Sequence, residues 1–311
     1  MLRLRLRAVT ASEAVTLVCI PNMARSAEIS RENFVAIIWP CRNLEAARII
    51  VGMTSKLKPP PFGPDSPVVS CTLPSPNFGD RRNGAQPDML ILHYTGMPSC
   101  ESAIRWLASP QSGVSCHYVM DEDGVITQMV PESFRAWHAG ISHWQGITDI
   151  NSCSIGIEIH NPGHDGGYPV FPNAQMAAVE ALCRDVIDRN GIAARRVLAH
   201  SDVAPRRKID PGEKFDWARL ALAGIGHWVA PAEIASGDSL ELGDDGEGVM
   251  SLQRNLRAYG YGIDPTGAFD EHTRIVVSAF QRHFRPVLVD GRADRSTVET
   301  LDALLEALEN G

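Results

Sequence analysis

Two histidines and one aspartate are the first candidates for chemistry in this sequence of 311 residues. His93 closes an apolar run at 89–96 ("MLILHYTG"), His200 closes a second one, and Asp210 follows within the segment 200–217. Loops that follow neighbouring strands meet at one edge of a sheet, so we expect these side chains to converge there. Two imidazoles and one carboxylate would make a three-ligand site with an open fourth position, the arrangement that catalytic zinc requires.

Two further charged residues belong to this constellation. Glu158 lies in the run 153–160 ("CSIGIEIH"), where we expect it to face away from the isoleucines. An unpaired carboxylate is unfavourable in an apolar strand, so Glu158 needs a partner or a function, and it could take a proton from water at the metal. Lys208, two residues before Asp210, could stabilise the oxyanion of a tetrahedral intermediate.

Each of these residues also has a purely structural explanation. A histidine at a strand end is often a hydrogen-bonded core residue, and a loop lysine is usually solvated. The residue types and their spacing therefore leave two interpretations open, a metal site and a set of unrelated structural residues.

The elements that must position these residues indicate an α/β domain with a mixed sheet. Apolar strands alternate with amphipathic helices, and an Asp-Gly turn within 116–130 predicts a β-hairpin. A serine at 99 and a glycine at 191 are typical of a helix start and a helix end. The predicted strands lie within 89–96, 116–130, 153–160 and 195–200, and the predicted helices within 99–110 and 173–191.

Composition excludes several classes of protein. A hydrophobic content of 44% and a charged content of 21% are those of a globular chain, and the net charge of −8 argues against nucleic-acid binding. Seven cysteines without a CxxC pair do not form a disulfide framework, so we expect scattered buried thiols. No apolar run approaches the roughly 18 residues of a membrane span.

The first 60 residues form a basic extension. Arg3, Arg5 and Arg7 resemble the start of a secretory signal with a cleavage site at 24–27, but polar residues interrupt the apolar stretch. There are two alternatives: the true start of the protein is Met53, or the first residues are a disordered segment. The compartment therefore stays open between the cytoplasm, which the poor signal favours, and the cell envelope.

A second domain follows the linker at 229–248. A helix is predicted from 249, and two similar segments at 266–273 and 290–297 form an internal repeat with the same spacing of Gly, Asp and Thr. Asp270 and Asp294 are placed to cap the helices that follow. We expect a small three-helix bundle.

Four segments in fixed order resemble one enzyme family: "ILHYTG", "AWHAG" (136–140), "SIGIEIHN" (154–161) and "HSDVAPRRKIDPG" (200–212). Together they are similar to the zinc-dependent N-acetylmuramoyl-L-alanine amidases of the family-2, T7 lysozyme-like and peptidoglycan recognition protein superfamily. The resemblance spans about 75–225. It implies one catalytic Zn²⁺ bound by His93, His200 and Asp210, Glu158 as the catalytic acid and base, and Lys208 as the oxyanion stabiliser.

The same resemblance assigns residues to the substrate cleft and implies a fold. That fold is a mixed central sheet flanked by helices. The predicted substrate-binding residues are Tyr94, His117, Trp137 and His138, and we expect the Gly/Pro-rich segment 161–172 to form a loop over the cleft. His117 either lines the site directly or supports a residue that does, and it is not expected to bind the metal. His143, His160 and His164 belong to no motif and are interpreted as surface residues.

The C-terminal segment 236–305 resembles peptidoglycan-binding domain 1, which suggests a wall-anchoring role. We therefore divide the chain into the basic extension (1–60), a zinc amidase domain (61–228), and a linker with a peptidoglycan-binding helical domain (229–311). The expected reaction cleaves the amide between N-acetylmuramic acid and L-alanine in peptidoglycan or muropeptides, by a monomer that binds no nucleic acid. Two alternatives are a recognition module that binds without cutting and a zinc peptidase that cuts within the stem peptide.

Overall fold

The computed structural model describes residues 30–31, 34–36, 51–53, 61–234 and 237–310 of the chain. The chain forms two compact units, Met1–Lys58 and Pro59–Gly311. In the first unit, three short strands pair as an antiparallel sheet: β1 (Ser30–Arg31), β2 (Phe34–Ala36) and β3 (Val51–Met53). The predicted signal and its cleavage site lie outside the described residues, and the start at Met53 stays a prediction.

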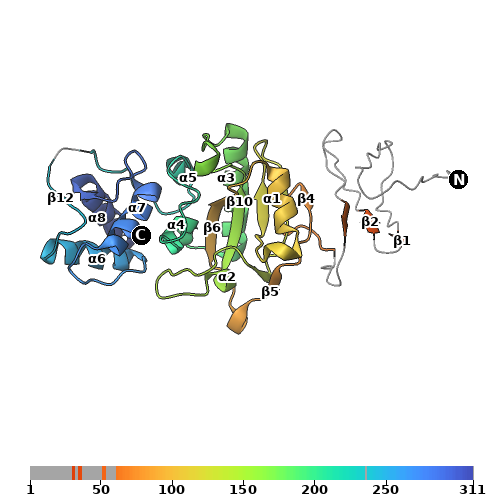
Figure 1. Cartoon of the computed structure of the whole chain (residues 1–311), viewed down its shortest axis with the longest axis horizontal. Coiled ribbons are helices and arrows are strands. Elements are labelled where there is room, and N and C mark those ends of the chain that lie inside the picture. The colour runs from red at the N-terminus through yellow and green to blue at the C-terminus, as the bar shows by residue number, and fades with distance from the viewer. Residues whose placement is uncertain (1–29, 32–33, 37–50, 54–60, 235–236, 311) are drawn as a thin grey trace. The chain divides into compact units, whose positions relative to one another are not determined.

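A six-stranded sheet forms the centre of the second unit, in the order β11-β6-β10-β7-β8-β4 (Figure 1). Its pairings are parallel except for the antiparallel hairpin of β7 and β8, which confirms both the mixed sheet and the predicted hairpin. The strands are β4 (Cys71–Thr72), β6 (Met89–Tyr94), β7 (Tyr118–Met120), β8 (Ile126–Gln128), β10 (Ser154–Ile159) and β11 (Val197–Ala199).

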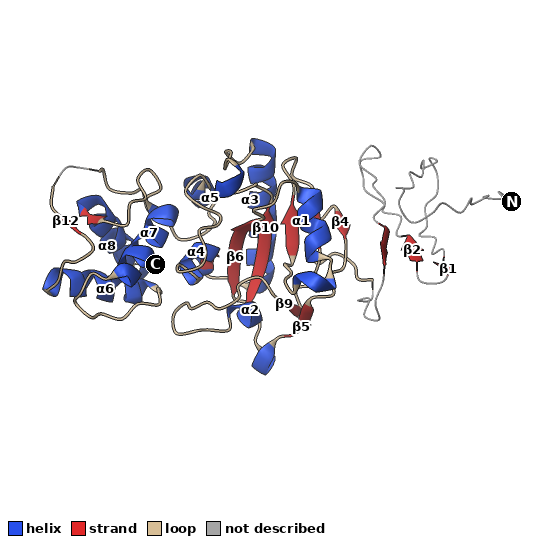
Figure 2. Cartoon of the chain, viewed as in Figure 1, coloured by secondary structure: helices blue, strands red, loops and turns tan. Residues whose placement is uncertain are grey.

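Alternation along β6 and β10 divides their side chains between two faces of the sheet. Leu90, Leu92 and the three isoleucines of β10 pack with α3 (Asn173–Asn190) and α5 (Trp217–Leu222) in one core. Because successive side chains of a strand point to opposite faces, His93 and Glu158 point away from that core, as predicted for Glu158. Figure 2 shows β6 and β10 side by side at the centre of this domain.

The helices begin and end largely where their capping residues predict. A capping box at Ser99 starts α1 (Cys100–Leu107), and Gly191, in the left-handed conformation, ends α3. The segment after β11 differs from its prediction, because His200 opens a short helix, α4 (His200–Val203), rather than a loop. Other short elements include α2 (Ile150–Cys153) and the antiparallel pair β5 (Phe78–Asp80) and β9 (Phe134–Ala136).

The C-terminal helices form the predicted three-helix domain with the predicted caps. Asp270 and Asp294 each accept a hydrogen bond from the backbone of a threonine three residues later, at 2.8 Å in both copies of the repeat. Part of the predicted linker belongs to this domain, since β12 (Ser239–Leu240) pairs with β13 (Ala293–Asp294). The helices are α6 (Glu247–Tyr259), α7 (Glu271–Phe284) and α8 (Arg295–Glu309).

One hydrophobic core joins the helical domain to the sheet. Met89 and Ile91 of β6, Trp144 of a connecting loop, and Phe280 and Phe284 of α7 are all buried in the same cluster. Among the described cysteines, Cys116, Cys153 and Cys183 are buried thiols, as expected, whereas Cys71 and Cys100 are only half-buried. Within the described part of the chain, no helix combines the length and apolar character needed to span a membrane.

Candidate active site

Parallel strand pairing places three candidate residues at one edge of the sheet. In the register of β6 and β10, His93 lies directly opposite Glu158. In the register of β11 and β6, Ala199 lies opposite Leu92, so His200 emerges one residue beyond it, next to His93. The carboxyl ends of β11, β6 and β10 therefore lie side by side, as predicted from the apolar runs in the sequence.

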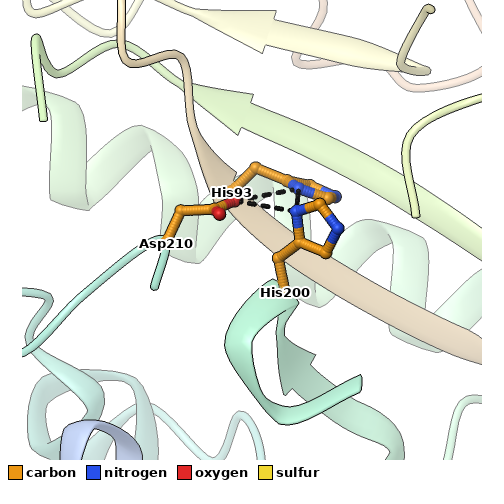
Figure 3. A group of neighbouring side chains, drawn as sticks. All are labelled: His93, His200 and Asp210. Carbon is orange, nitrogen blue, oxygen red and sulfur yellow. Dashed lines mark hydrogen bonds and ion pairs between the residues drawn. The ribbon is translucent and has the colours of Figure 1, made fainter. Parts of the chain in front are cut away.

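His93, His200 and Asp210 converge into one buried cluster (Figure 3). The Nδ1 atoms of the two histidines lie 2.8 Å apart, and Asp210 Oδ2 lies 3.2 Å from His93 Nδ1 and 3.0 Å from His200 Nδ1. Asp210 reaches the strand ends because its carbonyl accepts a hydrogen bond of 3.0 Å from the backbone N–H of Ser201. The segment between His200 and Asp210 thus turns back on itself to bring two candidate ligands together.

A chain of hydrogen bonds fixes which nitrogen of His93 faces the cluster. Ser154 Oγ donates to the carbonyl of Ile150 at 2.6 Å, so it can only accept from His138 Nε2 at 3.2 Å. The other nitrogen of His138, Nδ1, is then an acceptor for His93 Nε2–H at 3.0 Å. His93 Nδ1 is left with a lone pair directed at the cluster.

His200 is oriented in the same way. Its Nε2 donates to the carbonyl of Ala139 at 3.2 Å, which leaves Nδ1 as a lone pair facing His93. Two nitrogen lone pairs at 2.8 Å, beside a carboxylate, repel one another unless a cation joins them. Histidines that donate their outer N–H to fixed partners are typical of metal ligands, so this donor set fits a metal ion.

Burial controls the charge of these groups. Burial, with the neighbouring His200, lowers the pKa of His93 to about 4, so its ring is neutral near pH 7. Burial alone would raise the pKa of Asp210, but the contacts with His200 and His93 lower it below its usual range. A neutral imidazole and an ionised carboxylate are the forms that bind metal.

Glu158 is a carboxyl group without a hydrogen-bond partner among the described residues. Its Oε2 atom is buried and unpaired. Burial and the negative charge of Asp210 raise its pKa well above the usual value, while the charge of Lys208 acts in the opposite direction. A carboxyl group in this state is suited to proton transfer near neutral pH.

A cavity of about 370 Å³ opens onto this cluster. That volume lies within the range of small-molecule sites, which is about 300–1,000 Å³. His200, Asp210 and Glu158 line it, together with Lys208 and with three of the four predicted substrate-binding residues, Tyr94, Trp137 and His138. Asp165, from the Gly/Pro-rich segment 161–172, also lines the cavity, so this loop borders the cleft as expected.

The structure does not place His117 where a substrate contact was predicted. Its side chain is fully buried, and it does not line the cavity. Its Nδ1 accepts the backbone N–H of Gly156 at 3.0 Å, and its Nε2 lies 3.1 Å from the carbonyl of Phe134. His117 therefore fastens β10 to its surroundings and does not face the cleft.

Two histidines interpreted as surface residues have partners instead. His160 is buried and lies 3.1 Å from Glu122 Oε1 and 3.0 Å from Thr95 Oγ1. His164 accepts from the hydroxyl of Tyr94 at 3.1 Å, which ties the loop over the cleft to the end of β6. These two histidines belong to no motif, but that did not mean that they are exposed. Their partners lie far away in the sequence, so the local sequence could not reveal them.

Two supporting residues were missed by sequence reasoning. Arg207 donates to the carbonyls of Ala139 and Ile141 at 2.9 and 2.6 Å, which joins the segment after His200 to the segment after His138. Asp202 is fully buried and is hydrogen-bonded to Tyr261 and His283 of the helical domain. Both residues lie inside the motif 200–212, and this position was the only hint in the sequence that they support the site.

The mixed sheet, the His-His-Asp cluster at its edge and the unpaired glutamate define a hydrolase with a candidate metal centre. The chain matches the N-acetylmuramoyl-L-alanine amidase family over residues 83–213, and a peptidoglycan-binding domain family over residues 245–301. It belongs to the N-acetylmuramoyl-L-alanine amidase family, and its C-terminal domain is a peptidoglycan-binding domain.

Characterised relatives agree with this assignment. The chain is 38% identical to the N-acetylmuramoyl-L-alanine amidase AmiD of Escherichia coli over 233 residues, 70% of this chain and 82% of the relative. It is 35% identical to the 1,6-anhydro-N-acetylmuramyl-L-alanine amidase AmpD of the same organism, over 48% of this chain and 88% of that one.

Two solved structures share the fold. A complex of Escherichia coli AmiD with the substrate anhydro-N-acetylmuramic acid-L-Ala-D-gamma-Glu-L-Lys superposes with a TM-score of 0.61 at 36% identity, covering 74% of this chain and 98% of that one. AmpDh3 of Pseudomonas aeruginosa superposes with a TM-score of 0.60 at 28% identity, covering 73% and 94%. The relatives are amide hydrolases, which favours an enzyme over a recognition module.

Proposed function

We propose that this chain uses one zinc ion, held by His93, His200 and Asp210, to hydrolyse the amide between N-acetylmuramic acid and L-alanine. The observation that carries the metal is the pair of histidine lone pairs facing each other at 2.8 Å beside Asp210 Oδ2. Two imidazole nitrogens and one carboxylate oxygen are donors that suit zinc with an open fourth position. When bound there, zinc supplies Lewis-acid polarisation of a carbonyl and a nucleophile at neutral pH.

The protein's own residues carry the proton transfers in this proposal. Glu158 takes a proton from the attacking water as the oxygen bonds to the amide carbon. It then delivers that proton to the nitrogen of L-alanine as the C–N bond breaks, so the products are a free muramyl carboxylate and a free stem-peptide amine. Its position opposite His93 on the neighbouring strand supports this role, because it lies beside the proposed ligands.

The remaining cavity residues bind the substrate. Lys208 lies in the cavity wall, and we assign its ammonium to the carbonyl oxygen on which negative charge develops. Trp137, half-buried in the same wall, offers an apolar face for a sugar ring or a peptide. Tyr94, held by His164, supports the loop over the cleft.

We further propose a division of labour along the chain. Residues 61–228 form the amidase domain and residues 229–311 hold the enzyme on the wall polymer, while residues 1–60 are an extension. The substrate in the AmiD complex is an anhydro-muramyl peptide, and AmpD is named for the same sugar. A soluble anhydro-muropeptide is therefore the substrate with which we expect turnover first, by a monomeric enzyme.

The experiment pairs metal content with product mass. Purified protein is incubated with an anhydro-muropeptide, with and without a chelator, and the products are identified by mass spectrometry. We expect a free stem peptide and an intact muramyl sugar, lost on chelation and restored by zinc. The Glu158→Gln variant should retain zinc and lose turnover by at least about 100-fold, because the proton acceptor is gone.

Other products would point to the alternatives. Fragments cut within the stem peptide would indicate a zinc peptidase. Bound zinc without any cleavage would indicate a recognition module, and loss of zinc from Glu158→Gln would contradict the role given to Glu158.

A further inference from the structure

Asp202 is a fully buried carboxylate on α4, two residues after the candidate ligand His200. Both of its oxygens are hydrogen-bonded. Oδ2 accepts from the backbone N–H of Ala199 at 2.8 Å and from His283 Nδ1 at 2.7 Å, and Oδ1 accepts from the hydroxyl of Tyr261 at 2.7 Å. A buried carboxylate needs such partners, since an unpaired one is strongly destabilising.

Only one of these three donors belongs to the amidase part of the chain. Tyr261 lies in the turn after α6, and His283 lies on α7, so both come from the helical domain. The sequence separations are 59 and 81 residues. The helical domain therefore supplies two of the three hydrogen bonds that hold this carboxylate.

The donor His283 is itself fixed by packing. Its ring stacks on Trp217 of α5 with centroids 3.7 Å apart, and on Phe284 of its own helix with centroids 3.8 Å apart. Tyr261 is equally restrained, because its ring packs edge-on against Trp144 at 5.0 Å. Both donors are almost completely buried, so water does not replace them readily.

The turn that Asp202 holds is the one that joins the candidate metal ligands. Its bond to the N–H of Ala199 closes the first turn of α4, where His200 begins the helix. The next residue, Ser201, holds the carbonyl of Asp210 through its backbone N–H. A shift of α4 would therefore displace His200 and Asp210 together.

We propose that Asp202, Tyr261 and His283 are positioning residues through which the helical domain orients the metal-binding turn. The peptidoglycan-binding domain then has a second role besides anchoring, because the amidase site depends on it for the geometry of two ligands. This inference rests on the proposed zinc site. It differs from a purely structural interface, which would change the free energy of unfolding without changing zinc affinity in the folded protein.

Paired tyrosine variants test the proposal in the full-length chain. Tyr261→Phe deletes only the hydroxyl bonded to Asp202. Tyr259→Phe is the matched control, because its hydroxyl, also buried, bonds instead to His227 Nδ1 at 2.8 Å. Both variants lose one buried hydroxyl at the same junction, so a general loss of stability affects them alike.

Histidine variants supply the rescue. His283→Leu removes the donor and keeps an apolar side chain between Trp217 and Phe284, whereas His283→Asn retains an N–H donor near the position of Nδ1. Zinc affinity is measured by competition with a chromophoric chelator, on protein that far-UV circular dichroism shows to be folded. kcat and KM are measured separately on an anhydro-muropeptide.

We expect Tyr261→Phe and His283→Leu to weaken zinc binding by about tenfold, the lower end of the effect of residues that orient metal ligands, and to lower kcat more than they raise KM. His283→Asn should recover most of the loss, and Tyr259→Phe should bind zinc as the wild type does. Unchanged zinc affinity in folded Tyr261→Phe and His283→Leu would overturn the positioning role alone. A wild-type chain that binds no zinc would overturn the proposed function as well.

Discussion

At the scale of single residues, the fold sets the protonation of His93 and Glu158 in opposite directions. Burial and His200 lower the pKa of His93 to about 4, which keeps a lone pair available near pH 7. Burial and the charge of Asp210 raise the pKa of Glu158. His93 and Glu158 are register neighbours on two strands, and these opposite shifts suit the roles proposed for them, a neutral metal ligand and a proton carrier.

The unpaired carboxyl of Glu158 should make the metal-free protein less stable at high pH. Its pKa is raised on folding, so its contribution to stability is fully present below its unfolded pKa, about 4.3, and is lost as the pH rises through the folded pKa. Glu158→Gln removes the charge but keeps the shape. With chelator present, we expect the variant to exceed the wild type by about 1–3 kcal/mol in unfolding free energy at pH 8, measured by urea denaturation, and to match it at pH 4. An equal difference at both pH values would contradict the assignment.

Several of these residues could be predicted from the sequence, and others could not. His93 lies near the end of one apolar strand and His200 directly follows another, and Asp210 comes ten residues later. Parallel strands bring their carboxyl ends together, so the convergence of these residues was predictable and is confirmed. The role of His138 depends on which nitrogen carries hydrogen, which only its contact with Ser154 decides. His117 lies behind the cavity, with its ring centroid 5.7 Å from that of His138. The sequence alone could not decide this, because a histidine beside a motif does not reveal whether its ring faces the cleft or the core.

At the scale of elements, β10 combines two tasks on one face. Glu158 faces the cavity, and two residues earlier Gly156 leaves room for the ring of His138. A Cβ atom at Gly156 would lie 2.5 Å from His138 Cγ, which no packed structure tolerates. The glycine therefore leaves room for the hydrogen bond from His93 to His138 that directs the His93 lone pair toward the proposed metal site.

Gly156→Ala should damage the metal site through this contact. The added methyl group would push the His138 ring away from His93, and overpacking of this kind reduces stability by about 1–3 kcal/mol. We expect zinc affinity, measured by chelator competition, to fall by about tenfold or more, since the tautomer of His93 is no longer held. Gly79→Ala is the control, because Gly79 lies in β5 without left-handed backbone, and a methyl group added there would meet no atom within 4 Å. Similar zinc affinity in both variants would rule out this role for Gly156.

Element prediction succeeded where periodicity or capping was strong. The helices after Ser99, Asp270 and Asp294 begin where their capping side chains indicate. It failed at α4, because four residues complete only one helical turn and show no periodicity. Asp202 holds that turn through hydrogen bonds to Tyr261 and His283, which are far away in the sequence. Its conformation therefore depends on contacts that the local sequence does not reveal.

At the scale of the whole molecule, the two parts of the chain that match different families share one hydrophobic core. The amidase match ends at residue 213 and the peptidoglycan-binding match begins at 245. The buried cluster nevertheless runs from Met89 and Trp144 to Phe280 and Leu304 without interruption. Sequence composition indicated a linker between two domains. It could not show that the sheet and the helical domain pack together, because a pattern of apolar residues does not reveal which distant element covers them.

A shared core predicts that residues 61–310 unfold as one unit. Phe280→Ala removes a fully buried ring from α7 and should lower the unfolding free energy by about 3–5 kcal/mol. Because the core is continuous, thermal loss of amidase activity should shift to lower temperature together with the loss of helical circular dichroism. Val287→Ala, at a residue that is 84% exposed, should change the unfolding free energy by less than about 0.5 kcal/mol. Both thermal transitions should therefore stay near the wild-type temperature. If Phe280→Ala melted the helices while amidase activity persisted to the wild-type temperature, the two domains would be independent, and the helical domain would be an anchor without influence on the active site.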